Sequence, residues 1–390
     1  MRLVAATLYA LRIPFVESFN HSATERGCSD SIVVRVRDEN GVEGFGEGAP
    51  RAYVTGETTE TALAHLADTL WPRVAERTLP AADDALALAG VLPKASDLDA
   101  LGAVVPDVAL EGAVAAHASR AALELAILDC ALRRAGRSVA TILPPRRARV
   151  TYSGIITAGP LERVILHARR MRVVGFRHVK LKVGFADDVA RVRAVREALG
   201  PDVSLRLDAN GAWSFARAVD VLGAVEPFGV AAVEQPLPRG PVGELARLRA
   251  AVPVPIMADE SLVTPADAEA LLAEKAVDFF NLRVSKCGGL ARSLAIAARA
   301  AEAGVGVQVG SQVGETAILS AAGRHLAAAV PALAFAEGSF GTLLLAEDVS
   351  LESVRFGHRG EAGLFTGPGL GVTVVEERLR RHAVAARDLR

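Results

Sequence analysis

Six residues with side chains suited to chemistry recur at nearly even steps along this chain. The steps are 26, 26, 25, 27 and 26 residues, and the six are Lys182, Asp208, Glu234, Asp259, Lys286 and Gln312. Each ends or follows a short apolar run, such as VAAVEQP or VPIMADES. A strand, a helix and two loops take about that length. The spacing therefore predicts a β/α repeat with one such residue at each successive strand end.

Three of the six are carboxylic acids, Asp208, Glu234 and Asp259. In a closed (β/α)₈ barrel the C-terminal strand ends meet on one face, where active sites are built. Three carboxylates gathered there would repel one another without a cation, because burying uncompensated charge is costly. Mg²⁺ supplies that charge with oxygen coordination, and Mn²⁺ is the alternative ion. The structural alternative is a network of salt bridges with arginines.

The lysines predict acid–base chemistry beside that metal. Lys180 and Lys182 are two residues apart on a predicted strand, so both point to the same side. Their repulsion and desolvation should lower the pKa of one of them, which suits a base near neutral pH. Lys286 is expected on the sixth strand, across the barrel mouth from Lys182. Two such groups would move a proton at the carbon next to a substrate carboxylate, while the metal stabilises the enediolate. A pair of surface lysines is the alternative.

Two further polar residues accompany these groups. Asn210 follows Asp208 by two residues and shares its side of the strand. Asp208 would alternatively cap the next helix. Glu260 neighbours Asp259 and should point differently, so we expect it to position a lysine.

The elements that position these residues follow from periodicity. Residues 178–184, HVKLKVG, predict a strand, and 187–200 predict a helix with valines and a leucine at 3.6-residue spacing. Asp187 or Asp188 should cap that helix. This alternation continues to about residue 350, and eight units fit.

The N-terminal third has a different pattern. Alternating strands are joined at Asn40-Gly41, which predicts a hairpin. A helical pattern runs from about Thr58 to Ala135, most clearly over 118–136. The predicted fold is α/β: a (β/α)₈ barrel at 136–355, with an N-terminal α+β domain at 1–135 that the tail, 356–390, returns to and completes.

Composition limits the classes of function. The chain has 390 residues, 51% hydrophobic, and a net charge of −1, which gives no reason to expect nucleic acid or an acidic membrane as partner. Its three cysteines are far apart, which disfavours disulfides or zinc and fits a reducing cytoplasm. The first residues alternate like a strand rather than a secretion signal, and no apolar run is long enough for a membrane span.

The motifs together resemble those of the enolase superfamily, within it the muconate-lactonizing-enzyme subgroup. They are K-x-K at 180–182, D-A-N at 208–210, E-Q-P at 234–236, D-E-S at 259–261, K-x-G-G at 286–289, an early GFGEGAP and a late PGLGV. The resemblance implies a capping domain over a modified TIM barrel. It assigns metal binding to the three carboxylates and acid–base roles to Lys182 and Lys286. It also suggests that Lys180 helps to hold the substrate carboxylate.

The motifs that distinguish the substrate classes of this subgroup do not all point to the same class in this chain. Dipeptide epimerases of the subgroup usually carry Asp-x-Asp at the eighth strand end, where this chain has Glu337 and Ser339. The stretch SFGTLLLAEDV is more similar to muconate cycloisomerases, whereas PRAYVTGET resembles epimerases. Gln312, a substrate-binding candidate, stands where many relatives have a Met–Glu or Leu–Glu pair.

Two capping loops are expected to close over the far end of the substrate. They are residues 14–27, with His21, and residues 49–57, with Arg51 and Tyr53. These side chains offer donors suited to a second carboxylate or a carbonyl, and specificity usually resides in such loops. Ordinary surface loops are the alternative.

We therefore expect a cytoplasmic, homo-oligomeric, Mg²⁺-dependent enzyme that acts on a small-molecule carboxylate. The leading hypothesis is a cycloisomerase acting on an unsaturated or lactone acid. The alternative is a racemase or epimerase of N-acylamino acids or dipeptides. More remote are a Schiff-base lyase using Lys182 or Lys286, which borohydride would trap, and a binding protein without turnover.

Overall fold

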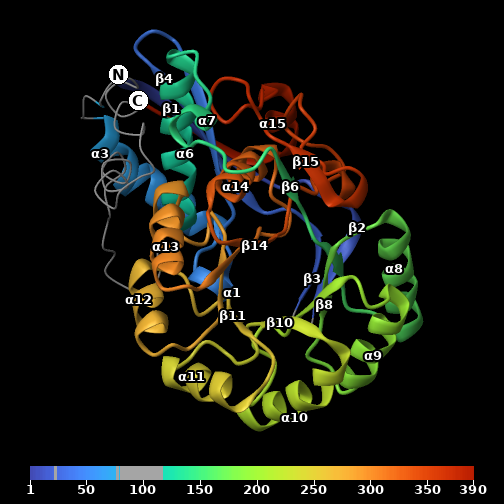
Figure 1. Cartoon of the computed structure of the whole chain (residues 1–390). Coiled ribbons are helices and arrows are strands. Elements are labelled where there is room, and N and C mark those ends of the chain that lie inside the picture. The colour runs from blue at the N-terminus through green and yellow to red at the C-terminus, as the bar shows by residue number, and fades with distance from the viewer. Residues whose placement is uncertain (22–23, 76–78, 80–116) are drawn as a thin grey trace.

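The computed structural model describes residues 1–21, 24–75, 79 and 117–390, and the centre of this part is a parallel eight-stranded sheet curled into a ring (Figure 1). Each strand pairs with the next in chain order. The strands are β7 (Gly154–Ile156), β8 (His178–Lys182), β9 (Ser204–Asp208), β10 (Val230–Glu234), β11 (Ile256–Ala258), β12 (Phe279–Leu282), β13 (Gly306–Val309) and β14 (Leu333–Ala336). The two edges meet where the Ser153 N–H donates to the Ala336 carbonyl oxygen at 2.8 Å. The predicted barrel is confirmed.

Helices surround the ring on its outside (Figure 1). They are α8 (Leu161–Val174), α9 (Asp188–Leu199), α10 (Phe215–Val225), α11 (Val242–Ala251), α12 (Pro265–Ala273), α13 (Leu290–Glu302) and α14 (Ala317–Ala329). Helix α9 buries Val192, Val195 and Leu199, as its period predicts. The predicted cap is wrong, because the Asp187 side chain caps no N–H and Asp188 accepts from the preceding turn at Gly184.

The N-terminal region contains a four-stranded antiparallel sheet in the order β16-β1-β4-β5. Its strands are β1 (Leu3–Leu11), β4 (Ser31–Asp38), β5 (Glu43–Gly48) and β16 (Ala383–Leu389). The predicted hairpin at Asn40-Gly41 joins β4 to β5, and Gly41 has a φ of +81° that this turn requires. Because β16 pairs with β1, the tail completes this sheet as predicted. The exact domain boundaries stay a prediction.

The remaining elements, apart from a ribbon described below, belong to these two parts or connect them. They are α1 (Ala52–Thr55), α2 (Thr59–His65), the π-helical turn Leu66–Leu70, α3 (Trp71–Ala75), α6 (His117–Arg134), α7 (Val139–Ile142), β6 (Arg149–Thr151), the 3₁₀ turns Glu226–Phe228, Gly341–Leu343 and His358–Gly360, β15 (Glu361–Gly363) and α15 (Glu376–His382). The clearest predicted helix is α6, whereas the predicted helical stretch at 80–116 lies outside the described residues. Within the described chain, no helix is both long and apolar enough to cross a bilayer.

Residues 14–27 were predicted to be a loop, and this prediction is wrong. They form most of a two-stranded ribbon, β2 (Pro14–His21) with β3 (Thr24–Cys28). The ribbon is also attached to the barrel, since the Val16 N–H donates to the Leu344 carbonyl oxygen at 2.8 Å. A partner that distant in the chain leaves no mark in the local sequence pattern.

Strand β5 explains the early GFGEGAP motif, because it lies between α6 and the barrel. A Cβ atom on Gly46 would come 2.0 Å from the Ala122 carbonyl oxygen of α6, so no side chain fits on that face of the strand at this position. On the other face, the Glu47 carboxylate accepts from the Thr316 and Leu319 N–H groups and caps α14. The motif therefore joins the N-terminal sheet to the barrel.

We expect Gly46→Ala to destabilise the protein by about 3 kcal/mol or more, because the added methyl overlaps helix backbone and cannot be relieved by a side-chain rotation. The midpoint of chemical denaturation measures this. The matched control is Gly223→Ala in α10, where no atom lies within 4 Å of the added Cβ. The control should unfold at the wild-type midpoint or slightly higher. Equal midpoints for the two variants would contradict the packing argument.

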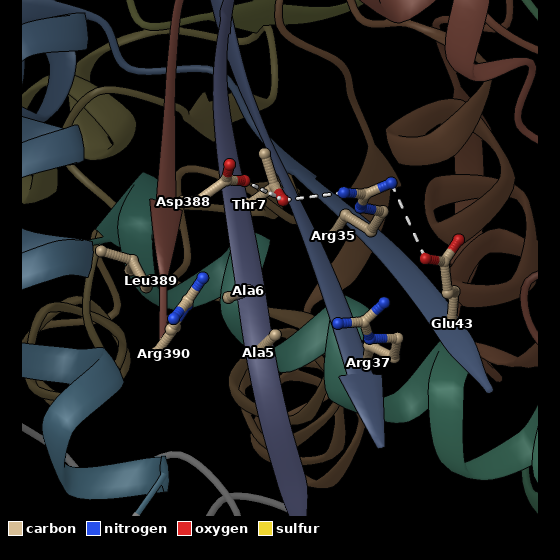
Figure 2. A pocket seen from close by; sticks show the side chains of 9 residues that line it. All are labelled: Ala5, Ala6, Thr7, Arg35, Arg37, Glu43, Asp388, Leu389 and Arg390. Atoms are coloured by element: carbon tan, nitrogen blue, oxygen red, sulfur yellow. Dashed lines mark hydrogen bonds and ion pairs between the residues drawn. The ribbon is translucent and has the colours of Figure 1, made fainter. Parts of the chain in front are cut away.

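A hollow on the open face of the N-terminal sheet lies over Ala5, between Arg37 and Arg390 (Figure 2). Arg35 at its edge donates to the Thr7 hydroxyl at 2.9 Å and lies 3.7 Å from the Glu43 carboxylate. Its lining residues all belong to this sheet or the chain segment beside it, and none comes from a barrel strand end. We therefore look for the chemistry elsewhere.

Candidate active site

The predicted carboxylates lie together at the C-terminal ends of the barrel strands. Asp208 and Glu234 are the last residues of β9 and β10 and pair in register, and Asp259 directly follows β11. All three are at most 1% exposed. Lys182 ends β8 on the neighbouring side. The 26-residue spacing has thus predicted these strand ends correctly.

Each carboxylate is compensated by cations or amides. Asp208 Oδ2 accepts from Lys182 Nζ at 2.7 Å and lies 3.0 Å from Lys180 Nζ. Glu234 Oε2 accepts from Lys180 Nζ at 3.1 Å. Asp259 Oδ1 accepts from Lys286 Nζ at 2.9 Å, and its other oxygen accepts from Arg283. Each of the three carboxylates is therefore paired with at least one buried cation.

These neighbours determine the direction of each pKa shift. Burial, with repulsion from Asp208, raises the pKa of Glu234 to about 8. Burial acts against ionisation of Asp208 too, but Lys180 and Lys182 outweigh it and lower its pKa. Burial likewise opposes charge on Lys180, yet the surrounding carboxylates raise its pKa above the ordinary value. For Lys180 this is opposite to the lowering that repulsion between the paired lysines predicts.

The two candidate acid–base lysines differ in their surroundings. Lys182 lines a cavity and donates to Asp208 and, at 2.7 Å, to Asn210 Oδ1. Lys286 does not lie on the sixth strand as predicted, because β12 ends at Leu282 and a turn follows. Its ammonium group donates to the Asp259 carbonyl at 2.7 Å, to Asp259 Oδ1, and to the Asn281 carbonyl at 2.8 Å. These three bonds use all three of its protons.

Helix α6 holds the turn that carries Lys286. His117 Nδ1 donates to the Lys286 carbonyl oxygen at 2.7 Å, and Arg120 donates to the Gly288 carbonyl oxygen. Directly after β5, the Ala49 N–H donates to Ser285 Oγ at 2.9 Å. The N-terminal region thus fixes one side of the barrel mouth.

The three carboxylates suit a hard divalent cation by their chemistry, since Mg²⁺ prefers oxygen ligands. In this conformation no three His, Cys, Asp or Glu side chains among the described residues are grouped so as to hold a metal ion. Lys180 and Arg283 lie among the carboxylate oxygens instead, and Arg283 also lies 3.7 Å from Glu234 Oε1. As oxygen donors the three carboxylates suit Mg²⁺, and the lysine and arginine groups bonded to them use part of that donor capacity here.

A small cavity opens above the strand ends. Its free space is about 40 Å³, which holds only a few water molecules. The residues that line it are Tyr53, Ile155, Lys180, Lys182, Asn210, Glu260, Arg283, Ser311, Val313, Glu337, Phe340 and Leu344. The structure thus brings five of the residues predicted from the sequence into one cavity: Tyr53, Lys180, Lys182, Asn210 and Glu260.

The remaining predicted residues are placed differently. Glu260 Oε1 accepts from Asn210 Nδ2 at 3.1 Å, so Glu260 contacts Lys182 only through that amide. Gln312 does not line the cavity, and its Oε1 accepts from Arg283 at 3.0 Å. Arg51 is 2% exposed and does not line the cavity. The His21 side chain lies outside the described residues.

Sequence reasoning gave no role to three charged residues of the site, Arg206, Arg283 and Glu337, although it noted Glu337 as a departure from a motif. Arg283 links Asp259 to Gln312, and Glu337 accepts from Lys180 at 2.5 Å and from Arg206 at 3.0 Å. Arg206 precedes the predicted ligand Asp208 by two residues, and Arg283 follows the polar strand residue Asn281 by two residues. The same two-residue spacing that paired Lys180 with Lys182 was available to find them.

Comparisons with known proteins agree with this geometry. A family model described as Enolase C-terminal domain-like matches residues 163–378. Muconate cycloisomerase 1 of Rhodococcus opacus is 32% identical over 380 residues, which cover 95% of this chain and 96% of that protein. The hydrophobic dipeptide epimerase of Enterococcus faecalis is 32% identical over 381 residues, covering 96% and 100%.

Solved structures extend the likeness to the whole fold. The N-succinyl Arg/Lys racemase of Bacillus cereus has a TM-score of 0.87 at 25% identity, with both chains covered completely. A dipeptide epimerase from Enterococcus faecalis, complexed with Mg and L-Leu-L-Tyr, has a TM-score of 0.81 at 27% identity, covering 96% of this chain and 100% of that one. The named activities are cycloisomerisation, epimerisation and racemisation.

Proposed function

The chain belongs to the enolase superfamily and is an isomerase of its muconate-lactonizing-enzyme subgroup, and on this premise we propose that it forms or consumes an enediolate next to a substrate carboxylate by proton transfer through Lys182. The observation that carries the proposal is the asymmetry of the two lysines. Lys182 lines the cavity, whereas Lys286 is 1% exposed and bonded to oxygen atoms through all its protons. A single proton-transfer group facing the substrate suits a cycloisomerase.

In that reaction Lys182 would move the proton at the carbon next to the carboxylate. Asn210 accepts from Lys182 and donates to Glu260, so the amide orients the ammonium group toward the cavity. Lys180 lines the same cavity, and its ammonium group would hold the substrate carboxylate there. Lys286 would act as a fixed positive charge beside Asp259.

Asp208, Glu234 and Asp259 would hold the divalent ion, Mg²⁺ or Mn²⁺. When bound, the ion would supply positive charge that stabilises the enediolate. The donor chemistry supports this assignment, and so does the Mg reported with the Enterococcus faecalis epimerase. A homo-oligomer in the cytoplasm stays a prediction.

Racemisation or epimerisation is the second candidate, because relatives with these activities match the chain as well as the cycloisomerase does. Racemisation would require Lys286 to break one of its three present hydrogen bonds before it could transfer a proton to or from the substrate. Glu337 is already bonded to Lys180 and Arg206, so it is not available to hold the ammonium group of a dipeptide. An N-acylamino acid is therefore favoured over a dipeptide within this candidate.

A Schiff-base lyase is disfavoured, because it needs a neutral amine and both lysines are hydrogen-bonded to carboxylates. The test of the proposal is deuterium uptake at the carbon next to the carboxylate, measured by NMR in D₂O across a panel of unsaturated, lactone and N-acylated acids. We expect uptake that requires Mg²⁺ and stops in excess chelator. Uptake that continues in chelator, or an adduct trapped by borohydride, would reject it.

A further inference from the structure

The outer wall of the cavity is uncharged and mostly apolar. The name outer wall is used here for Tyr53, Val313, Phe340 and Leu344, which line the cavity from segments beyond the strand ends. Ser311 adds a hydroxyl to the same surroundings. Tyr53 is 51% exposed although its ring lines the cavity. A ligand that fills the cavity would cover these side chains.

The charged lining residues all lie on the inner side, at the strand ends. They are Lys180, Lys182, Glu260, Arg283 and Glu337. Each is already hydrogen-bonded to another side chain of the site. The positive charges of the site are therefore concentrated where the reacting carboxylate would bind, and the outer wall offers none among the described residues.

Arg51, the cation expected to bind a second carboxylate, is directed elsewhere. One of its terminal nitrogens donates to the Asp30 carbonyl at 2.8 Å and the Pro50 carbonyl at 2.6 Å. The other donates to the Val313 carbonyl at 2.6 Å. Arg51 thus fixes the backbone behind the outer wall and presents no guanidinium to the cavity.

The outer wall is held in place by contacts outside the cavity. The Val16 N–H of β2 donates to the Leu344 carbonyl oxygen. The Phe340 ring packs edge-on against Phe356, with centroids 5.9 Å apart. The apolar side chains are therefore part of a built surface rather than of a free loop.

From this surface we infer that the substrate is a carboxylic acid whose end remote from the reacting carbon is uncharged and apolar or aromatic. The inference rests on the proposed function for the carboxylate end. A group held against the outer wall loses much of its water there, so a second charge would be desolvated beside side chains that carry no charge. An apolar group would instead gain by removing the outer wall from water.

The test compares the binding of matched acids to the wild-type protein with Mg²⁺ by isothermal titration calorimetry. One pair varies the acyl end, N-phenylacetylalanine against N-succinylalanine. The other varies the side chain, N-acetylphenylalanine against N-acetylglutamate. In at least one pair we expect the apolar member to bind roughly 10- to 100-fold more tightly, and in neither pair should the charged member be preferred.

Two variants locate the preference. Tyr53→Arg adds a cation to the outer wall at a half-exposed position that should not disturb folding, and it should shift the preference toward the charged member of the pair. Leu343→Ala is the matched control, because Leu343 is 47% exposed beside Leu344 but does not line the cavity. The control should keep the wild-type preference.

Failure of the inference and failure of the proposed function give different results. If the charged members bind as tightly as the apolar ones, or Tyr53→Arg leaves the ratio unchanged, the assignment of the outer wall is wrong. If these acids show the expected preference in binding but no acid of the wider panel exchanges its proton, the proposed function fails and the outer wall assignment stands. If none of the four binds, the comparison is repeated with the acids of the wider panel that exchange deuterium, and a charged remote end on the tightest binder would overturn the inferred substrate class.

Discussion

Asp208→Asn, Glu234→Gln and Asp259→Asn are each expected to abolish turnover and to weaken Mg²⁺ binding severely. Each removes one of the three buried carboxylates that would hold the ion, and a hard cation loses both a ligand and a negative charge. Calorimetric titration with Mg²⁺ and deuterium exchange on a responsive acid measure the two effects separately.

Neutralising one of these acids also leaves a buried lysine or arginine without its partner, which costs stability. Denaturation midpoints must therefore accompany the activity data. Glu244→Gln on the exposed surface of α11 is the matched control and should behave as wild type. Full activity of the wild-type enzyme in excess chelator, or unchanged Mg²⁺ affinity in all three folded variants, would contradict the metal assignment.

Lys182→Ala is expected to lose roughly 10²- to 10⁴-fold in turnover, the range that positioned acid–base groups contribute. Lys286→Ala should also lose activity, but through the missing positive charge beside Asp259 rather than through the proton itself. Deuterium exchange followed for each enantiomer of a chiral acid separates these roles. For a cycloisomerase, exchange should depend chiefly on Lys182.

A racemase gives a different result in the same experiment. Each single variant would then still exchange the proton of one enantiomer, and the two variants would spare opposite enantiomers. The double variant should be inactive under either mechanism. Near-normal activity of folded Lys182→Ala/Lys286→Ala would rule out both.

The sequence predicted the barrel and its charged strand ends because both depend on local periodicity. Lys182, Asp208 and Glu234 are each the last residue of a strand, as the even spacing requires. The same spacing placed Lys286 on a strand, although it lies in a turn that α6 holds from more than 160 residues away. Spacing indicates where an element ends, but it does not show how the following turn is supported.

Pairing between side chains was the part that sequence could not predict. Arg51 has the right chemistry to bind a carboxylate, yet it is directed to the carbonyl of Val313, which is 262 residues distant. Glu337 was noticed as a departure from a motif, but its bonds to Lys180 and Arg206 depend on closure of the barrel. Such partners are decided by three-dimensional proximity rather than by residue type.

The pairing of β1 with β16 has a consequence for the order of assembly during synthesis. Thr7 lies opposite Asp388, so one edge of β1 finds its partner only after residues 383–389 have been made. The barrel strands, each beside its sequence neighbour, can pair long before that, because contacts close in sequence form at lower entropic cost. Until then β1 has an unpaired edge, and such edges recruit strands from other chains. Translation speed and chaperone access should therefore affect the yield of this protein more than they affect its final stability.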